Sequence, residues 1–252
     1  MKLSNSLILN GLFSLVLSFL CVSAPRAMSA APTAETLKEI PEIATQYETT
    51  FQAKTAGATP ITSRWRLWRS AREVEVYQVG SKDGEAYALD GAGGVIFFRI
   101  LHPERTQVFF NAMELRILGH SVDWERCCSL IGPGFVHENL KLVGEETYLG
   151  RTVQRFEGEV DAEKWSVLWS EKDQLAVSVI SENAVRVAKT EMKEIFELKD
   201  QPWDRLRARG YKTVPYTELA DNDTDPEMKL IMRRLGMKCS HKGCGPVCLT
   251  PR

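Results

Sequence analysis

Hydrophobic and polar positions alternate with a period of two over most of the middle of this chain, as they do in strands with one buried face. Two stretches show this best: GVIFFRILHPERTQVFF (residues 94–110) and KWSVLWSEKDQLAVSVI (residues 164–180). Each contains two apolar runs separated by a short polar break, which is typical of adjacent antiparallel strands. Both faces of the first pair are largely apolar, so we expect the sheet to be covered on both sides.

Further strands are shorter and are separated by turn residues at 81–84 and 90–94. They are expected at residues 64–69, 73–80, 85–89, 113–118, 152–160, 185–188 and 193–198. The pattern therefore predicts a mainly β protein with flanking helices (α+β), built on a curved antiparallel sheet or half-open β-barrel of about ten strands.

Helical spacing occurs in a few places. Residues 31–55 are predicted to be helical, because apolar residues recur three and four positions apart, and Pro41 would either kink this helix or divide it into two short ones. Asp123 is a candidate N-cap for a short helix over residues 124–131, and a second short helix is expected within residues 132–143.

The last third of the chain has a different character. A helix is expected over residues 202–209, then an extended stretch at 211–216, and a last helix with Asp225 as N-cap and Pro226 as its first residue. The DNDTD run before this helix lacks the glycine and the bidentate glutamate of a calcium loop, so capping is the better interpretation.

The N-terminus has the features of a secretory signal peptide. Lys2 precedes an apolar run over residues 7–22, and a stretch of mostly small residues at 27–31 offers a cleavage site near Ala30. We therefore expect a signal peptide (residues 1–30), an antiparallel β domain with an N-terminal helix (31–200) and a helical or irregular cysteine-containing extension (201–252). The mature protein would be periplasmic or secreted.

Charge and motifs exclude several classes of function. Removal of residues 1–30 takes away two basic residues and no acidic one, so 30 basic residues face 33 acidic ones and the formal charge changes from −1 to −3. The mature chain therefore has no excess of basic residues with which to bind the phosphates of a nucleic acid. The sequence also lacks GxSxG, HExxH and CxxC motifs. We assign no catalytic residue and expect a protein that is not an enzyme, with a hydrolase without a recognisable motif as the third alternative.

Cysteines are the most distinctive feature of the mature chain. Cys127 and Cys128 lie on a predicted helix, and Cys239, Cys244 and Cys248 lie in a tail without apolar periodicity. An oxidising compartment favours disulfides, and neighbours on a helix point about 100° apart. We therefore expect at least one disulfide between the helical pair and a tail cysteine.

A metal site is the alternative for the tail. Cys239, His241, Cys244 and Cys248 would suit Zn²⁺ or Cu(I), although their spacing matches no common zinc pattern. In that case the protein would be a metal-handling or redox scaffold, with zinc or copper as its cofactor. Otherwise no cofactor is expected.

The chain also resembles the periplasmic lipoprotein-carrier class of the LolA/LolB/RseB type over roughly residues 33–198. The stretches that carry the resemblance are RLWRSAREVEVYQV, EETYLGRTVQRFEGE and KWSVLWSEKDQLAVSVI, after a signal peptide and an amphipathic N-terminal helix. Members of this class wrap a half-open barrel around an apolar cavity closed by helices, and bind acyl chains or lipidated peptides. The cysteine-bearing helix and the tail from about Pro202 depart from that pattern.

The resemblance and the aromatic residues on the predicted strands lead to one functional hypothesis. We expect an exported, non-enzymatic binding protein with an apolar groove for acyl chains, lipid or a lipidated protein, with a membrane surface as a further candidate contact. A plain sandwich core would use the same aromatic residues. The groove residues are predicted to be Trp65, Trp68, Phe98, Phe110, Trp165 and Trp169.

Overall fold

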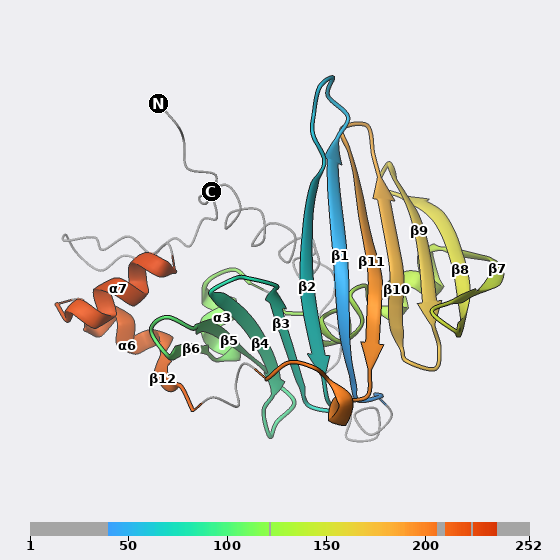
Figure 1. The fold of residues 1–252 in the computed structure, drawn as a ribbon. Coiled ribbons are helices and arrows are strands. Elements are labelled where there is room, and N and C mark those ends of the chain that lie inside the picture. Colours follow the sequence, from blue (N-terminus) through green and yellow to red (C-terminus); the bar gives the residue numbers. More distant parts are fainter. Residues whose placement is uncertain (1–39, 121, 206–209, 223, 236–252) are drawn as a thin grey trace.

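A computed structural model describes residues 40–120, 122–205, 210–222 and 224–235 (Figure 1). They form one twelve-stranded sheet in the order β12-β6-β5-β4-β3-β2-β1-β11-β10-β9-β8-β7. The strands are β1 (Ile43–Ala53), β2 (Ile61–Arg69), β3 (Glu73–Gln78), β4 (Asp83–Leu89), β5 (Val95–Leu101), β6 (Thr106–Phe110), β7 (Lys141–Tyr148), β8 (Arg151–Val160), β9 (Glu163–Ser170), β10 (Leu175–Glu182), β11 (Arg186–Phe196) and β12 (Lys212–Pro215).

This architecture confirms the predicted fold class. The sheet is curved (Figure 1). It is open because β7 and β12, the strands at the two ends of the order, do not pair with each other. The two hairpins that the alternation predicted are present as β5–β6 and β9–β10. Consecutive strands pair antiparallel within β1–β6 and within β7–β11, and β1 pairs with β11 to join the two halves.

The helix predicted over residues 31–55 is wrong for its second half, which forms strand β1. Apolar residues at helical spacing suggested a helix, but the same segment alternates in steps of two over Ile43, Thr45, Tyr47 and Thr49, all of which are buried. β1 lies between β2 and β11. Tertiary pairing on both edges therefore outweighs the weak helical preference. Residues 31–39 lie outside the described part of the chain.

Five α-helices accompany the described strands: α3 (Ala112–Ile117), α4 (Trp124–Ser129), α5 (Pro133–Asn139), α6 (Tyr216–Asp221) and α7 (Pro226–Arg234). The predicted N-caps are confirmed, since Asp123 accepts from the Arg126 amide and Asp225 from the Glu227 amide. The strand predicted at residues 113–118 is instead α3. Its capping box, in which Asn111 and Glu114 satisfy each other's backbone amides, is the local signal that the alternation obscured.

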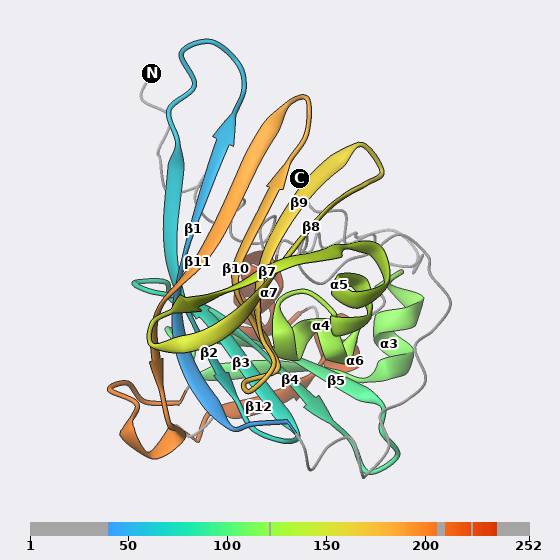
Figure 2. The same ribbon diagram turned by 90° about the vertical axis from the view of Figure 1, so that its right-hand side faces the viewer.

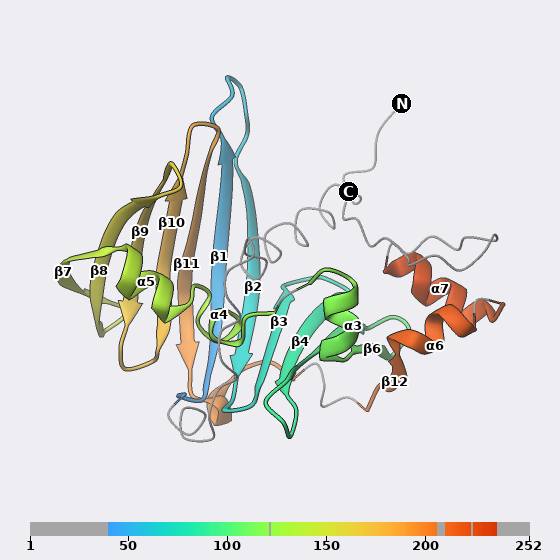
Figure 3. The same ribbon diagram turned by 180° about the vertical axis from the view of Figure 1, so that it is seen from behind.

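Helices α3, α4 and α5 lie on one side of the sheet (Figures 2 and 3). α4 and α5 cross the inner side of the curve, and side chains from both join the largest core cluster with residues of β1–β4 and β8–β11. We call α4, α5 and the connecting residues 130–132 the roof, and the sheet surface beneath it the inner face. Hairpins β1–β2, β8–β9 and β10–β11 extend past the roof at one end (Figure 2).

The chain after β11 crosses the opposite, outer face of the sheet. Trp203 packs there against Ala44 and Trp68, and the Arg205 guanidinium lies 3.6 Å from the Trp68 ring centroid. The chain then adds β12 parallel to β6, and α6 and α7 pack beside it around Leu219 and Ile231. The described part of residues 201–252 is thus continuous with the sheet.

Several predictions concern residues outside the described ranges. These are the signal peptide (1–30), the tail cysteines Cys239, Cys244 and Cys248, and His241. Among the described residues, no helix is long and apolar enough to cross a membrane. Within the same ranges, no group of three or more histidine, cysteine or acidic residues is placed to hold a metal ion.

Candidate functional site

The strand register places a row of residues side by side across six strands of the inner face. Residues directly opposite each other in an antiparallel pair point to the same face. We call this set the distal row because it lies toward the free ends of the three long hairpins. It consists of Ile61, Phe51, Ala188, Ser181, Trp165 and Gly158.

The distal row is apolar and is covered only in part. The Trp165 ring contacts Phe135 of α5 edge to face, with centroids 5.1 Å apart, which fixes the row on the roofed side. Ile61 is 38% exposed, and Phe51, Ala188 and Trp165 are half-buried. The inner face therefore continues past the edge of the roof as a partly exposed aromatic and aliphatic strip.

One step closer to the roof lies a second row, which runs Ser63, Thr49, Thr190, Val179, Val167 and Phe156. Its first half carries hydroxyls. The hydroxyls of Thr49 and Thr190 are 2.9 Å apart, and the Trp65 indole N–H donates to Thr49 over 2.9 Å. Its second half is apolar and joins the main core cluster. The strip is thus continuous with the interior.

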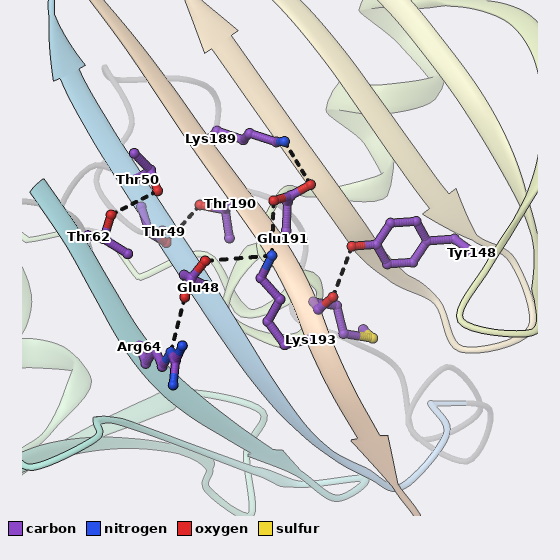
Figure 4. A network of polar contacts seen from close by, with 11 residues as sticks. Glu48, Thr49, Thr50, Thr62, Arg64, Tyr148, Lys189, Thr190, Glu191 and Lys193 are labelled. Carbon is purple, nitrogen blue, oxygen red and sulfur yellow. Dashed lines mark hydrogen bonds and ion pairs between the residues drawn. The ribbon is translucent and has the colours of Figure 1, made fainter. Parts of the chain in front are cut away.

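The outer face beside these rows has the opposite character (Figure 4). Arg64 donates to Glu48 over 3.0 Å, and Lys193 lies 3.6 Å from Glu48 and 3.1 Å from Glu191. The hydrogen bond from Arg64 lowers the pKa of the Glu48 carboxyl. These partly exposed charged side chains make the outer face hydrophilic, and each ion pair contributes little to stability. We assign this group of ion pairs a structural role.

The roof is tied to the sheet by Arg69, the last residue of β2, whose side chain is fully buried. Among the described residues, its guanidinium donates only to backbone carbonyls: Pro41 before β1, Cys128 in α4, and Asp173 and Gln174 in the β9–β10 turn. One planar group therefore holds the roof, the start of β1 and the β9–β10 turn together. Arginine suits this because it has five donors in a rigid fork.

Burial lowers the pKa of the Arg69 guanidinium because it disfavours the charged form. Nearby groups complete the polar layer. Ser170 donates to the Asp173 carboxylate over 2.6 Å, and Arg151 lies 3.3 Å from the same carboxylate. The Tyr47 hydroxyl donates to the Ala176 carbonyl over 2.9 Å. This layer lies at the end of the sheet opposite the distal row, so the roof is fixed by polar bonds at one end.

The other end of the roof rests on the distal row. Leu140, which follows α5, packs over Gly158: a Cβ at that glycine would lie 2.9 Å from a Leu140 methyl carbon and 3.2 Å from the Asn139 carbonyl oxygen. Only a residue without a side chain lets α5 approach β8 this closely. The contact is steric and apolar.

Cys127 and Cys128 are both buried in α4, at 5% and 3% exposure. Their predicted disulfide partners lie outside the described residues, so the disulfide stays a prediction. Its geometry is now restricted, because a tail cysteine would have to reach beneath the roof.

The six residues predicted to line a groove are all at least partly buried, but they do not lie together. Trp65, Trp165 and Trp169 belong to the inner-face cluster. The other three, Phe110, Phe98 and Trp68, belong to three separate clusters. Sequence reasoning missed Phe51, Ile61 and Arg69. The first two could have been found from the alternation in β1 and β2, whereas Arg69 bonds only to backbone and leaves no sequence signal.

Glu125, in the first turn of α4, gives a pH-dependent prediction. Partial burial and the neighbouring acids Asp123 and Glu138 raise the pKa of its carboxyl. A raised folded-state pKa means that the charged form opposes folding, so this penalty grows as the pH rises above the unfolded value. We expect Glu125→Gln to raise the free energy of unfolding at pH 7 by at most about 0.5 kcal/mol, since the side chain is largely exposed.

The gain should vanish below about pH 3, where the carboxyl is protonated in both states. Urea denaturation of the variant and of the unaltered protein at both pH values measures this difference. An equal gain at both pH values would contradict the electrostatic cause.

Comparison with known proteins gives structural neighbours only. Neither a protein-family model nor a curated protein matches the sequence. One similar solved structure is PNGF-II in space group P21, with a TM-score of 0.34, 12% identity and coverage of 70% of this chain and 33% of that chain. Another is MucB in complex with MucA(peri), with a TM-score of 0.33, 11% identity and coverage of 65% of this chain and 52% of that chain. A third is the LolA superfamily protein NE2245 from Nitrosomonas europaea, with a TM-score of 0.29, 10% identity and coverage of 68% of this chain and 96% of that chain.

The third of these structures bears the LolA name of the class that the sequence resembles. The chain spans about a third of the first of these structures and about half of the second. At these identities and TM-scores, the similarities assign no ligand, partner or reaction to this chain.

Proposed function

We propose that this protein is an exported, non-enzymatic binding protein that takes up an acyl chain, from a lipid or a lipidated protein, between the inner face of the sheet and the roof. The observation that carries the proposal is the distal row. Phe51, Ile61 and Trp165 form a partly exposed apolar strip that runs directly into the core beneath α4 and α5.

Binding at such a site depends on the apolar surface area that is buried and requires no reactive group. Each methylene removed from water contributes about 0.8 kcal/mol. A chain laid along the distal row would bury its own surface together with that of the exposed side chains. The strip is several strands wide, which suits an extended, flexible ligand.

The roof gives this site a means of admitting more of the chain. The contacts described at its two ends differ, because Arg69 fixes one end with hydrogen bonds while Leu140 rests on Gly158 at the other. Apolar contacts are not directional, and they can be exchanged for contacts with a ligand at little cost. We therefore expect the α5 end to yield first and the α4 end to stay attached.

An environment-sensitive fluorescent fatty-acid probe tests the proposal. We expect saturable binding to the purified mature protein, and we expect Phe51→Asp to weaken it more than tenfold, because a carboxylate in the strip would have to lose its water before a hydrocarbon chain could lie against it. Thr50→Asp is the matched control. Thr50 is the neighbour on the outer face of β1 and pairs with Thr62, so the probe should bind that variant unchanged.

Two results would contradict the proposal. One is the absence of probe binding by protein with a folded circular-dichroism spectrum. The other is equal affinity of the Phe51→Asp and Thr50→Asp variants, which would place the bound probe away from the distal row.

A further inference from the structure

Two tryptophans in the main core cluster have indole N–H groups without an acceptor among the described residues: Trp124 and Trp169. Their side chains are 4% and 1% exposed. Buried donors are almost always hydrogen-bonded in proteins, because leaving one unpaired is destabilising. The same cluster satisfies a third indole, since the Trp65 N–H donates to Thr49. An indole N–H can only donate, so each of these two groups requires an acceptor.

These donors come from the two surfaces that enclose the proposed binding region. Trp169 is on β9, on the same face as Trp165 of the distal row, because strand residues four apart point the same way. At about 3.3 Å per residue it lies roughly 13 Å further along the strand. Trp124 is the first residue of α4 in the roof. A ligand that enters from the distal row would pass between a donor on the sheet and a donor on the roof.

The charge of the interior restricts what such a ligand can carry. The fully buried cation of this region, Arg69, already donates to four backbone carbonyls. A carboxylate in the interior would lack a charged partner, and burying an unpaired charge is unfavourable. An alcohol would bring a further donor to a region that already has two unpaired ones. A neutral group that only accepts hydrogen bonds fits best.

We propose that the ligand is an acyl ester, and that Trp124 and Trp169 donate to its carbonyl oxygens while the hydrocarbon lies along the inner face. This inference rests on the proposed function and adds the chemical group that is recognised. The two indoles then determine specificity for esters over plain alkyl chains.

Displacement of the fluorescent probe by two matched ligands tests this. Methyl hexadecanoate carries an ester carbonyl, and hexadecyl methyl ether has a similar length without one. We expect the ester to bind about fivefold more tightly for each hydrogen bond gained. Trp169→Phe and Trp124→Phe keep an aromatic ring and remove the N–H. Each should lower the ester affinity about fivefold and leave the ether affinity unchanged.

Trp203→Phe is the matched control. The Trp203 indole N–H is also buried without an acceptor in the described part of the chain, but it lies on the outer face with Ala44 and Trp68. Its replacement should change neither affinity. The two test positions lie on different elements, so one remains informative if the other variant fails to fold.

The outcomes separate the two proposals. Equal affinities for ester and ether in the unaltered protein, or ester affinities that stay the same in both folded tryptophan variants, would overturn the ester inference and leave the acyl-chain site standing. Failure of the unaltered protein to bind the probe would overturn the acyl-chain site itself.

Discussion

Replacement of Arg69 by methionine is expected to lower the free energy of unfolding by about 3–5 kcal/mol. Methionine fills much of the same space but donates nothing. The carbonyls of Pro41, Cys128, Asp173 and Gln174 would then lose the partner that the guanidinium supplies. Because these carbonyls belong to three separate segments, the loss should also loosen the roof from the sheet.

Urea denaturation followed by tryptophan fluorescence measures this change, provided that the slope of the transition is unaltered. Arg64→Met is the matched control on the same strand, since the Arg64 side chain is 66% exposed and pairs with Glu48 on the outer face. We expect that variant to change stability by less than about 0.5 kcal/mol. Similar losses in both variants would show that Arg69 has no special role.

Gly158→Val is expected to destabilise the protein by about 2–3 kcal/mol, because the added side chain would overlap the segment that follows α5. A Leu140 methyl can rotate away, but the Asn139 carbonyl oxygen, 3.2 Å from the new Cβ, is part of the backbone and must move. The substitution should therefore lift the α5 end of the roof. Hydrogen exchange of the α5 amides should accelerate together with the loss of stability.

Gly144→Val on the neighbouring strand β7 provides the comparison. A Cβ at Gly144 meets no atom within 4 Å, and valine favours strands. We expect this variant to keep the stability of the unaltered protein or to exceed it slightly. Destabilisation of both variants to the same extent would indicate a general effect of valine in these strands.

The strands were predictable wherever alternation was uninterrupted. The segments around Phe97–Phe109 and Val167–Val179 alternate over several residues on each side of a short polar turn, and both form the expected hairpins. Residues 43–53 were mispredicted because a β-branched and aromatic strand in the middle of a sheet can also satisfy a helical spacing. Only its pairing with β2 and β11 decides between the two, and pairing is not visible in a local window.

The residues of the candidate site were predictable only in part. Aromatic residues on strands indicated an apolar surface, yet alternate positions of one strand face opposite sides of the sheet. Trp65 and Trp68 illustrate this, because they are three residues apart and belong to the inner-face and outer-face clusters respectively. The fold must be known before a set of aromatic residues can be divided between two faces.

The order of the strands also has a consequence for how the chain reaches this fold. β1 pairs with β11 and β12 with β6, and contacts between these pairs span 141 and 106 residues of sequence. During synthesis, β1–β6 can form their local hairpins early, but both flanks of that half then stay open until much later segments emerge. Closing such long loops is entropically costly and slows folding. The half-finished sheet, with unpaired edges at β1 and β6 until Pro215 has been made, is the species in which aggregation is most to be expected.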